Sequence, residues 1–170
     1  MTVREASPAD APAIERIARA SWPATYGGLL AEQTIGRFLD DRYGVAVLEL
    51  EIELCAGGER GIFLVTERGG EPIGYLHFVA SGELGPELKR LYVHPGALGS
   101  GAGSALLAEL HRRLEAGISY VVVVHPANER ALLFYRRRGM VDAGETKALL
   151  RDERTESGCD VLLRATVPAR

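Results

Sequence analysis

A glycine-rich stretch near the middle of the chain, "LYVHPGALGSGAGSALL" (residues 91–107), most constrains how this sequence can fold. An apolar run typical of a strand precedes the glycines, and a leucine-rich run with helical spacing follows them. The first turn of a helix has free backbone N–H groups at the positive end of its dipole, and glycines remove the Cβ atoms that would hold a polyphosphate away. The stretch therefore predicts a phosphate-binding loop. The alternative is a tight strand-to-helix turn without a ligand.

The glycine spacing discriminates among phosphate ligands. A Walker A loop requires a lysine after its last glycine, and this stretch contains none. The dinucleotide fingerprint is Gly-x-Gly-x-x-Gly within a βαβ unit. Here Gly99, Gly101 and Gly103 have a Gly-x-Gly-x-Gly spacing and come after a predicted hairpin. Neither a nucleoside triphosphate nor a dinucleotide fits well.

The pattern of the whole chain predicts a single mixed α/β (α+β) domain over residues 1–170. Residues 47–55, "VLELEIELC", are ambiguous because they alternate like a strand but have the composition of a helix. The predicted strands are residues 2–7, the hairpin 61–81, and residues 86–95, 119–125, 146–152 and 159–167; the predicted helices are residues 7–22, 30–41, 99–117 and 128–140.

Two motifs, in order and spacing, resemble those of the GNAT superfamily of N-acetyltransferases. The first is the glycine stretch, in which a strand ending in a hydrophobic-x-Val-x-Pro phrase runs into the family's acetyl-CoA loop. The second is "NERALLFYRRRGM" (residues 128–140), with an asparagine at its start, a Phe-Tyr pair and a glycine-hydrophobic end. The resemblance implies the GNAT acyltransferase fold, which is a central mixed, mostly antiparallel sheet with splayed middle strands and about four flanking helices. It also favours a helix for residues 45–56.

The resemblance further implies acetyl-CoA as cosubstrate, and no metal is expected because the sequence has no His-x-x-x-His or Cys-x-x-Cys pattern. The backbone of Leu91, Tyr92 and Val93 would pair with the pantetheine arm, and the Val93 N–H would donate to the thioester oxygen as a one-donor oxyanion hole. Asn128 would brace the pantetheine or the loop besides capping its helix. Arginines 136–138 are either a solvated helix face or a contact to the 3′-phosphate. The loop that would cradle the diphosphate consists of Leu98, Gly99, Ser100, Gly101, Ala102, Gly103 and Ser104.

One loop position departs from the family. The family has Arg or Gln at the head of the loop, and this chain has Leu98. The backbone contacts to the diphosphate survive this change, because Leu98 keeps its N–H group. A favourable side-chain contact is missing, so a lower affinity for the cofactor is expected.

Two side chains are implied in proton transfer. Tyr135 occupies the family's tyrosine position and would donate to the departing CoA thiolate, whose thiol has a pKa of about 8.5. Without the motif, Tyr135 would be interpreted as a core ring. Glu87, just before the "YV" phrase, would remove a proton from the amine directly or through water, and its alternative is a solvated charge at a sheet edge. Glu83 and His125 are weaker candidates for the base, and His94 is assigned to local scaffold.

The acceptor site is expected beneath the first two helices. Their link, "SWPATYGGLL" (residues 21–30), would form a flexible wall of the pocket and loosely resembles the segment of family members that act on small amines and polyamines. Tyr26, Tyr75 and Glu87 are the candidate substrate contacts. Trp22 is better explained as a core residue.

The sequence therefore predicts transfer of an acetyl group from acetyl-CoA to a primary amine by direct attack in a ternary complex. A small-molecule amine is favoured over a protein N-terminus or lysine. Two other classes stay open. The first is a non-catalytic acyl-CoA-binding or sensing module, against which the intact Tyr135 and Glu87 argue. The second is a nucleotide-binding α/β protein of another kind.

Composition limits partners and location. The net charge of −3 argues against nucleic acid as a partner. No apolar run approaches the roughly 20 residues of a membrane span. The two cysteines are far apart in sequence, as expected for reduced thiols in the cytoplasm. We expect a cytoplasmic protein, and a homodimer would be in keeping with the family.

Overall fold

The computed structural model describes residues 1–147 and 159–169. It is built on a seven-stranded sheet with the order β1-β2-β3-β4-β5-β7-β6. The strands are β1 Thr2–Glu5, β2 Gly61–Arg68, β3 Glu71–Gly82, β4 Gly85–Val93, β5 Ser119–Val124, β6 Val141–Lys147 and β7 Cys159–Thr166. The helices are α1 Ala11–Tyr26, α2 Glu32–Tyr43, α3 Val45–Cys55, α4 Ala102–Arg113 and α5 Glu129–Arg136, with 3₁₀ turns at Pro8–Asp10 and Pro95–Ala97.

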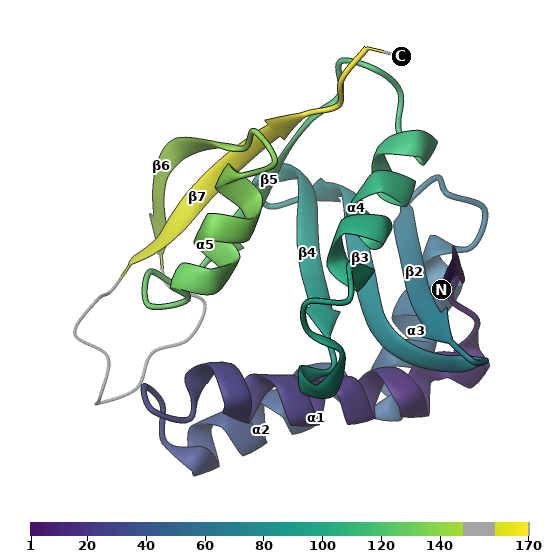
Figure 1. Cartoon of the computed structure of the whole chain (residues 1–170), viewed down its shortest axis with the longest axis vertical. Helices are drawn as coiled ribbons and strands as arrows, with labels where there is room; N and C mark the ends of the chain where they lie inside the picture. Colours follow the sequence, from purple (N-terminus) through teal and green to yellow (C-terminus); the bar gives the residue numbers. More distant parts are fainter. Residues whose placement is uncertain (148–158, 170) are drawn as a thin grey trace.

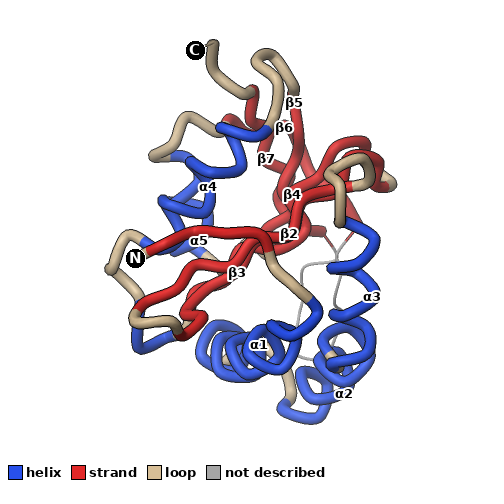
Figure 2. The backbone as a smooth tube through the Cα atoms, turned by 90° about the vertical axis from the view of Figure 1, so that its right-hand side faces the viewer, coloured by secondary structure: helices blue, strands red, loops and turns tan. Residues whose placement is uncertain are grey.

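The sheet separates two layers of helices (Figures 1 and 2). Helices α1, α2 and α3 cover one face, where Ile14, Leu48 and Tyr75 belong to one buried apolar cluster. Helices α4 and α5 cover the other face, where Leu106 and Leu163 belong to a second cluster. Burial of an apolar face on each side explains the continuous apolar runs in β2 ("IFLV") and β5 ("VVVV").

The middle of the sheet is splayed. Every neighbouring pair of strands is antiparallel except β4 and β5, which run parallel and share a single residue pair, Glu87 and Val121. Beyond this pair the two strands diverge toward the C-terminal end of β4 (Figure 1). The mostly antiparallel sheet with splayed middle strands confirms the expected fold, although the described residues contain five α-helices rather than about four.

Residues 47–55 are helical, as the resemblance favoured. Leu48 and Ile52 lie one turn apart and are buried, whereas Glu53 is exposed. The alternation of Leu and Glu therefore supplies one apolar helix face through its four-residue spacing. The β5 prediction is also confirmed, since Val121, Val122 and Val124 are buried between the helical layers.

The prediction of a flexible link at residues 21–30 is wrong in its first part, because α1 continues to Tyr26. Pro23 lies inside this helix and removes one backbone hydrogen bond. Trp22 and Tyr26 are four residues apart and both buried, so packing of this face outweighs the proline. A wall of the site that was expected to be a loop is thus a helix.

The first of the two closing strands begins earlier than predicted. Strand β6 covers residues 141–147, whereas residues 146–152 were expected, and 148–152 lie outside the described residues. Strand β6, "VDAGETK", lies at the sheet edge, and among the described residues it pairs with β7 alone. Its register shifts between Asp142 and Gly144. A mostly exposed edge strand with a bulge lacks the apolar alternation on which the prediction depended.

A buried histidine makes this fold sensitive to acid. His77 on β3 is 3% exposed and stacks on Phe63 with ring centroids 4.7 Å apart. Burial, with smaller contributions from Arg90 and Lys89, lowers the pKa of His77 from 6.5 to about 3. Between these values the unfolded chain binds a proton that the native state does not, so stability is lost as the pH falls below about 6.5.

We expect this one group to lower the free energy of unfolding by about 1 kcal/mol between about pH 7.5 and about pH 5.5. His77→Phe should remove that part of the decline, because phenylalanine keeps a ring on Phe63 and cannot be protonated. Urea denaturation at the two pH values measures the effect. An equal decline in wild type and His77→Phe would contradict the assignment to His77.

Among the residues that the structure describes, no helix combines the length and apolarity needed to cross a membrane.

Candidate active site

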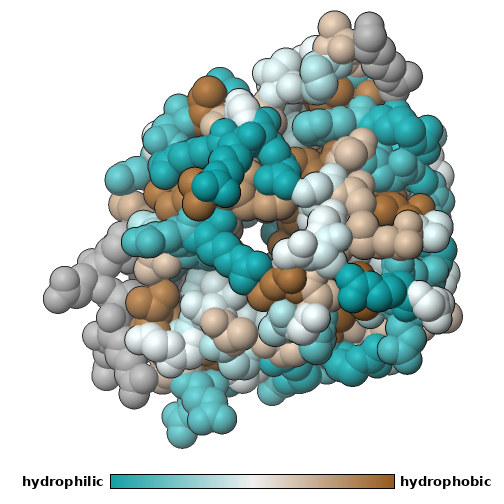
Figure 3. Space-filling model, viewed as in Figure 1, coloured by the Kyte–Doolittle hydropathy of each residue, from teal (hydrophilic) through white to brown (hydrophobic). Residues whose placement is uncertain are grey.

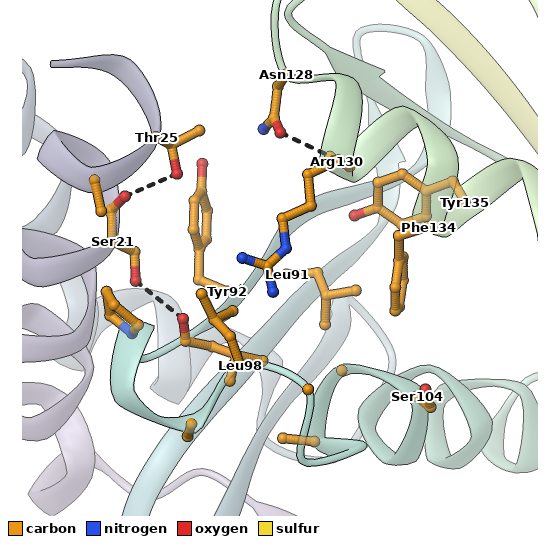
Figure 4. Close-up of a pocket in the computed structure, with 18 of the residues that line it drawn as sticks. Ser21, Thr25, Leu91, Tyr92, Leu98, Ser104, Asn128, Arg130, Phe134 and Tyr135 are labelled. Carbon is orange, nitrogen blue, oxygen red and sulfur yellow. Dashed lines mark hydrogen bonds between the residues drawn. The ribbon is translucent and has the colours of Figure 1, made fainter. Parts of the chain in front are cut away.

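A cavity of about 720 Å³ lies at the end of β4, between the start of α4, helix α5 and the C-terminal half of α1 (Figure 4). Seen from the same side as in Figure 1, the surface of the molecule has a hollow near its middle, with strongly hydrophilic side chains along the edge (Figure 3). The cavity wall brings together most of the predicted cofactor-binding residues, namely Leu91, Tyr92, Val93, Leu98, Gly99, Gly101, Ala102, Gly103, Ser104, Asn128 and Tyr135.

The glycine loop presents the N-terminus of α4 to this cavity. Gly99 and Gly101 have φ values of 79° and 87°, a region that favours glycine. Gly101 immediately precedes α4, so the N–H groups of the first helical turn have no carbonyl acceptor within the helix. Ser100 does not line the cavity, and its hydroxyl accepts from the Ala102 N–H at 3.4 Å. Leu98 projects an apolar side chain that is 43% exposed.

The last residues of β4 offer a second set of backbone donors. The His94 N–H donates to the Ile73 carbonyl on β3 at 2.8 Å. Inward and outward backbone groups alternate along an antiparallel ladder. The N–H and C=O groups of Leu91 and Val93 therefore face away from β3, toward the side on which β5 diverges. This edge of β4 can pair with an extended ligand as a further strand would.

Helix α1 is anchored to this same edge. The Ser21 hydroxyl lies 2.7 Å from the Ile17 carbonyl and 3.3 Å from the Val93 carbonyl (Figure 4). One turn later, the Thr25 hydroxyl donates to the Ser21 carbonyl at 2.8 Å. Ser21 thus satisfies the outward carbonyl of Val93 and leaves the neighbouring N–H groups of the edge to the cavity.

Tyr135 reaches the cavity from α5. Its ring is 5% exposed and belongs to the core, whereas its hydroxyl points into the cavity (Figure 4). No described residue forms a hydrogen bond with this hydroxyl. Burial raises the pKa of Tyr135 well above its ordinary value, so the phenol keeps its proton at neutral pH. The structure therefore combines the two interpretations of Tyr135, a core ring with a free donor at its tip.

Asn128 connects helix α5 to helix α1. Its Oδ1 accepts from the Ala131 N–H at 3.1 Å and so caps α5, which confirms the capping prediction. Its Nδ2 donates to the Tyr26 hydroxyl on α1 at 3.3 Å. Tyr26 is 7% exposed and does not line the cavity, so its position is that of a brace behind Asn128.

Tyr75 is not at the cavity wall either. It is fully buried and stacks between Phe63 and Tyr92, with centroid distances of 6.3 and 5.7 Å. Trp22 is 3% exposed and packs on Tyr92 and Tyr26, as expected for a core residue. This aromatic cluster fixes the β4 end against α1.

Glu87 lies at the one residue pair that still joins β4 to β5. Burial raises the pKa of this half-buried carboxyl, with a smaller opposing effect from Lys89. A Cβ atom at Gly82 would meet Glu87 Oε2 at 2.7 Å, so the carboxylate lies against the turn between β3 and β4. Glu87 does not line the cavity.

The cavity wall includes residues that the sequence analysis did not assign to the site. Among them are Arg130 and Phe134 on α5, whereas Ser21, Ala24 and Thr25 belong to the segment that was expected to form a pocket wall, and Arg138 had been considered for the 3′-phosphate. The polar pair Ser21 and Thr25, four residues apart on an otherwise buried helix face, is a signal that could have been noticed. His94, assigned to scaffold, accepts from the Gly96 N–H at 3.1 Å and so shapes the turn before the loop.

Within the described parts of the chain, no three His, Cys, Asp or Glu side chains gather as metal ligands would. His125, a weaker candidate for the base, does not line the cavity, and its Nδ1 accepts from the Ala127 N–H at 3.2 Å.

Residues 59–140 match the family model described as an acetyltransferase (GNAT) domain. This range contains β2, β3, β4, the glycine loop, α4, β5 and α5. No curated protein sequence matches the chain significantly.

Solved structures of acetyltransferases share the fold over nearly the whole chain. The PaiA N-acetyltransferase of Thermoplasma acidophilum, in complex with coenzyme A, is 22% identical with a TM-score of 0.79, covering 97% of this chain and 98% of its own. The phosphinothricin acetyltransferase of Sinorhizobium meliloti, in complex with acetyl-CoA, is 23% identical with a TM-score of 0.72, and the match covers 98% of this chain and 88% of that one. YncA of Salmonella typhimurium, a putative acetyltransferase with its cofactor acetyl-CoA, is 20% identical with a TM-score of 0.72, and the match covers 100% of this chain and 95% of that one.

Proposed function

We propose that the chain is a GNAT acetyltransferase and that it transfers the acetyl group of acetyl-CoA to the primary amine of a small molecule, by direct attack in a ternary complex. The observation that carries this proposal is one cavity in which an outward β4 edge, a helix N-terminus and a buried tyrosine hydroxyl meet. Two of the similar solved structures contain acetyl-CoA and one contains coenzyme A, which supports the same cosubstrate here.

The cosubstrate would be held by backbone groups. The first turn of α4 and the loop from Leu98 to Ser104 would receive the diphosphate, because free N–H groups and the helix dipole both favour an anion. The outward groups of Leu91 and Val93 would pair with the pantetheine amides, and the Val93 N–H would donate to the thioester oxygen. Asn128 would brace this arm from α5.

The chemistry would then require two proton transfers. The neutral amine forms a C–N bond to the thioester carbon, and the C–S bond breaks. The Tyr135 hydroxyl would donate to the departing sulfur, and Glu87 would accept the amine proton through water, since its carboxylate lies outside the cavity wall. Tyr26 and Tyr75 would support the acceptor site from behind the cavity wall.

The proposal is tested by thermal unfolding with acetyl-CoA, CoA, NAD and ATP. A ligand at 100 times its dissociation constant adds about 2.7 kcal/mol to the stability of a protein that binds it only when folded. We expect a rise in melting temperature with acetyl-CoA and CoA and none with NAD or ATP, followed by turnover on a panel of small amines. Absence of any shift with CoA would overturn the proposal, and binding without turnover on small amines, peptides or lysine would favour an acyl-CoA-binding module.

Glu87→Gln should lower kcat/KM for the accepted amine by about 100-fold at neutral pH, because the amide cannot accept a proton. Its effect should shrink at high pH, where more of the amine is already neutral. The affinity for CoA should stay unchanged, since Glu87 does not line the cavity. A pH–rate profile of wild type and variant measures this, and an unchanged kcat/KM would mean that water alone or another group is the base.

A further inference from the structure

Arg138, just after α5, is a cation on the cavity wall that is held only by neutral groups among the described residues. Its Nη1 donates to the Phe134 carbonyl at 2.9 Å, and its Nη2 donates to the Ser104 hydroxyl. The guanidinium lies 3.6 Å above the centre of the Phe134 ring. These contacts fix the direction of the side chain without neutralising its charge.

Several other arginines of this protein are neutralised. Arg4 contacts Asp10 at 2.7 Å, Arg19 contacts Asp40 at 2.7 Å, and the neighbour Arg136 contacts Asp142 at 3.0 Å. The carboxylates raise the pKa of Arg4 and of Arg19, whereas partial desolvation lowers the pKa of Arg138. A guanidinium that is held in one direction on a cavity wall, without a carboxylate partner among the described residues, can bind an anionic ligand.

The position of Arg138 indicates which anion this is. Ser104 belongs to the first turn of α4, so the guanidinium stands beside the free N–H groups that follow the glycine loop. Leu98, at the head of the loop, also lines the cavity but has an uncharged side chain. Arg130 also lines the cavity, and its side chain extends from α5 toward Leu91 (Figure 4), but among the described residues only Arg138 forms a hydrogen bond to Ser104.

We propose that Arg138 binds the diphosphate of CoA and serves as the side-chain cation that the loop lacks at Leu98. The inference rests on the proposed function, because it needs CoA in this cavity. It places the side-chain cation at the end of α5, 40 residues after Leu98 in the sequence. It also gives Ser104 a role, which is to hold the guanidinium over the loop.

The test is calorimetric titration of wild type and Arg138→Gln with CoA and with 3′-dephospho-CoA, without any turnover. We expect the variant to bind both ligands about tenfold more weakly, since a charge-assisted contact to the shared diphosphate is lost. The matched control is Arg37→Gln. Arg37 lies on α2, away from the cavity, and its guanidinium also donates to a neutral carbonyl, that of Gln33 at 3.4 Å. Its removal changes the net charge equally and should leave both affinities unchanged.

The outcomes separate the hypotheses. Weaker binding of CoA but unchanged binding of 3′-dephospho-CoA would place Arg138 on the 3′-phosphate and overturn the proposal. Equally weakened binding in Arg37→Gln would mean that the effect comes from net charge alone, which would also overturn the proposal. Unchanged affinity in Arg138→Gln would overturn it as well. If wild type does not bind CoA at all, the proposed function fails, which is a different result.

A second substitution tests the replacement itself. Leu98 is 43% exposed, with extended backbone that an arginine can adopt, so Leu98→Arg should fold normally. In the Arg138→Gln background it should recover most of the tenfold loss, whereas in wild type it should add much less. An equal gain in both backgrounds would show that the two positions serve different groups and would overturn the inference.

Discussion

Gly101→Val is expected to weaken CoA binding by about 100-fold, through loss of the backbone geometry that presents the first turn of α4. Gly101 has a φ of 87°, which a β-branched residue adopts only at a cost of about 1–2 kcal/mol. The loop should therefore rotate and turn its N–H groups away from the diphosphate, while the new side chain enters the cavity that Gly101 lines. Losing hydrogen bonds to a charged group accounts for an effect of this size.

The matched control is Gly57→Val. Gly57 has a φ of 86°, nearly the same as Gly101, and a Cβ there would meet nothing within 4 Å. It lies in the turn after α3 and does not line the cavity. Both variants should lose about 1–2 kcal/mol of unfolding free energy, but calorimetry should find weaker CoA binding only in Gly101→Val. If the two variants bind CoA equally well, the loop backbone does not hold the diphosphate.

The glycine loop was predictable because its information is local. Gly99 and Gly101 adopt positive φ values that favour glycine, and the helical spacing of the leucines that follow them predicts a helix. The same holds for Asn128, whose capping bond reaches only to Ala131. The cofactor side of the site therefore follows from two short segments, each of which carries its own conformational preference.

The rest of the site depends on contacts between distant segments. Ser21 meets Val93 across 72 positions, and Arg138 meets Ser104 across 34. The sequence around Ser21 or Arg138 does not predict these contacts, because each contact depends on how α1 and α5 pack on the sheet. Tyr75 illustrates the converse, since an aromatic residue that was expected to contact the substrate proved to be fully buried.

Tyr135→Phe should lower kcat by about 100-fold, the lower end of what a positioned proton donor contributes. The ring would stay in place, because it packs in the core, and only the hydroxyl that points into the cavity would be lost. Because burial raises the pKa of Tyr135, the donor stays protonated at alkaline pH. The wild-type kcat profile should therefore show no decline from tyrosine ionisation below about pH 10. The affinity for CoA should change less than about twofold, since no hydrogen bond to the ground-state thioester is required of the phenol.

Tyr120→Phe provides the comparison that separates chemistry from packing. Tyr120 is 1% exposed, burial also raises its pKa, and its hydroxyl lies 2.7 Å from His111 Nε2. Its loss should cost about 1 kcal/mol of unfolding free energy through that hydrogen bond and leave kcat unchanged, since Tyr120 does not line the cavity. The Tyr135 hydroxyl, which no described residue engages, should show the opposite pattern, with little effect on stability and a large effect on kcat. A fully active Tyr135→Phe would reduce Tyr135 to a core ring, and the leaving thiolate would then take its proton from solvent.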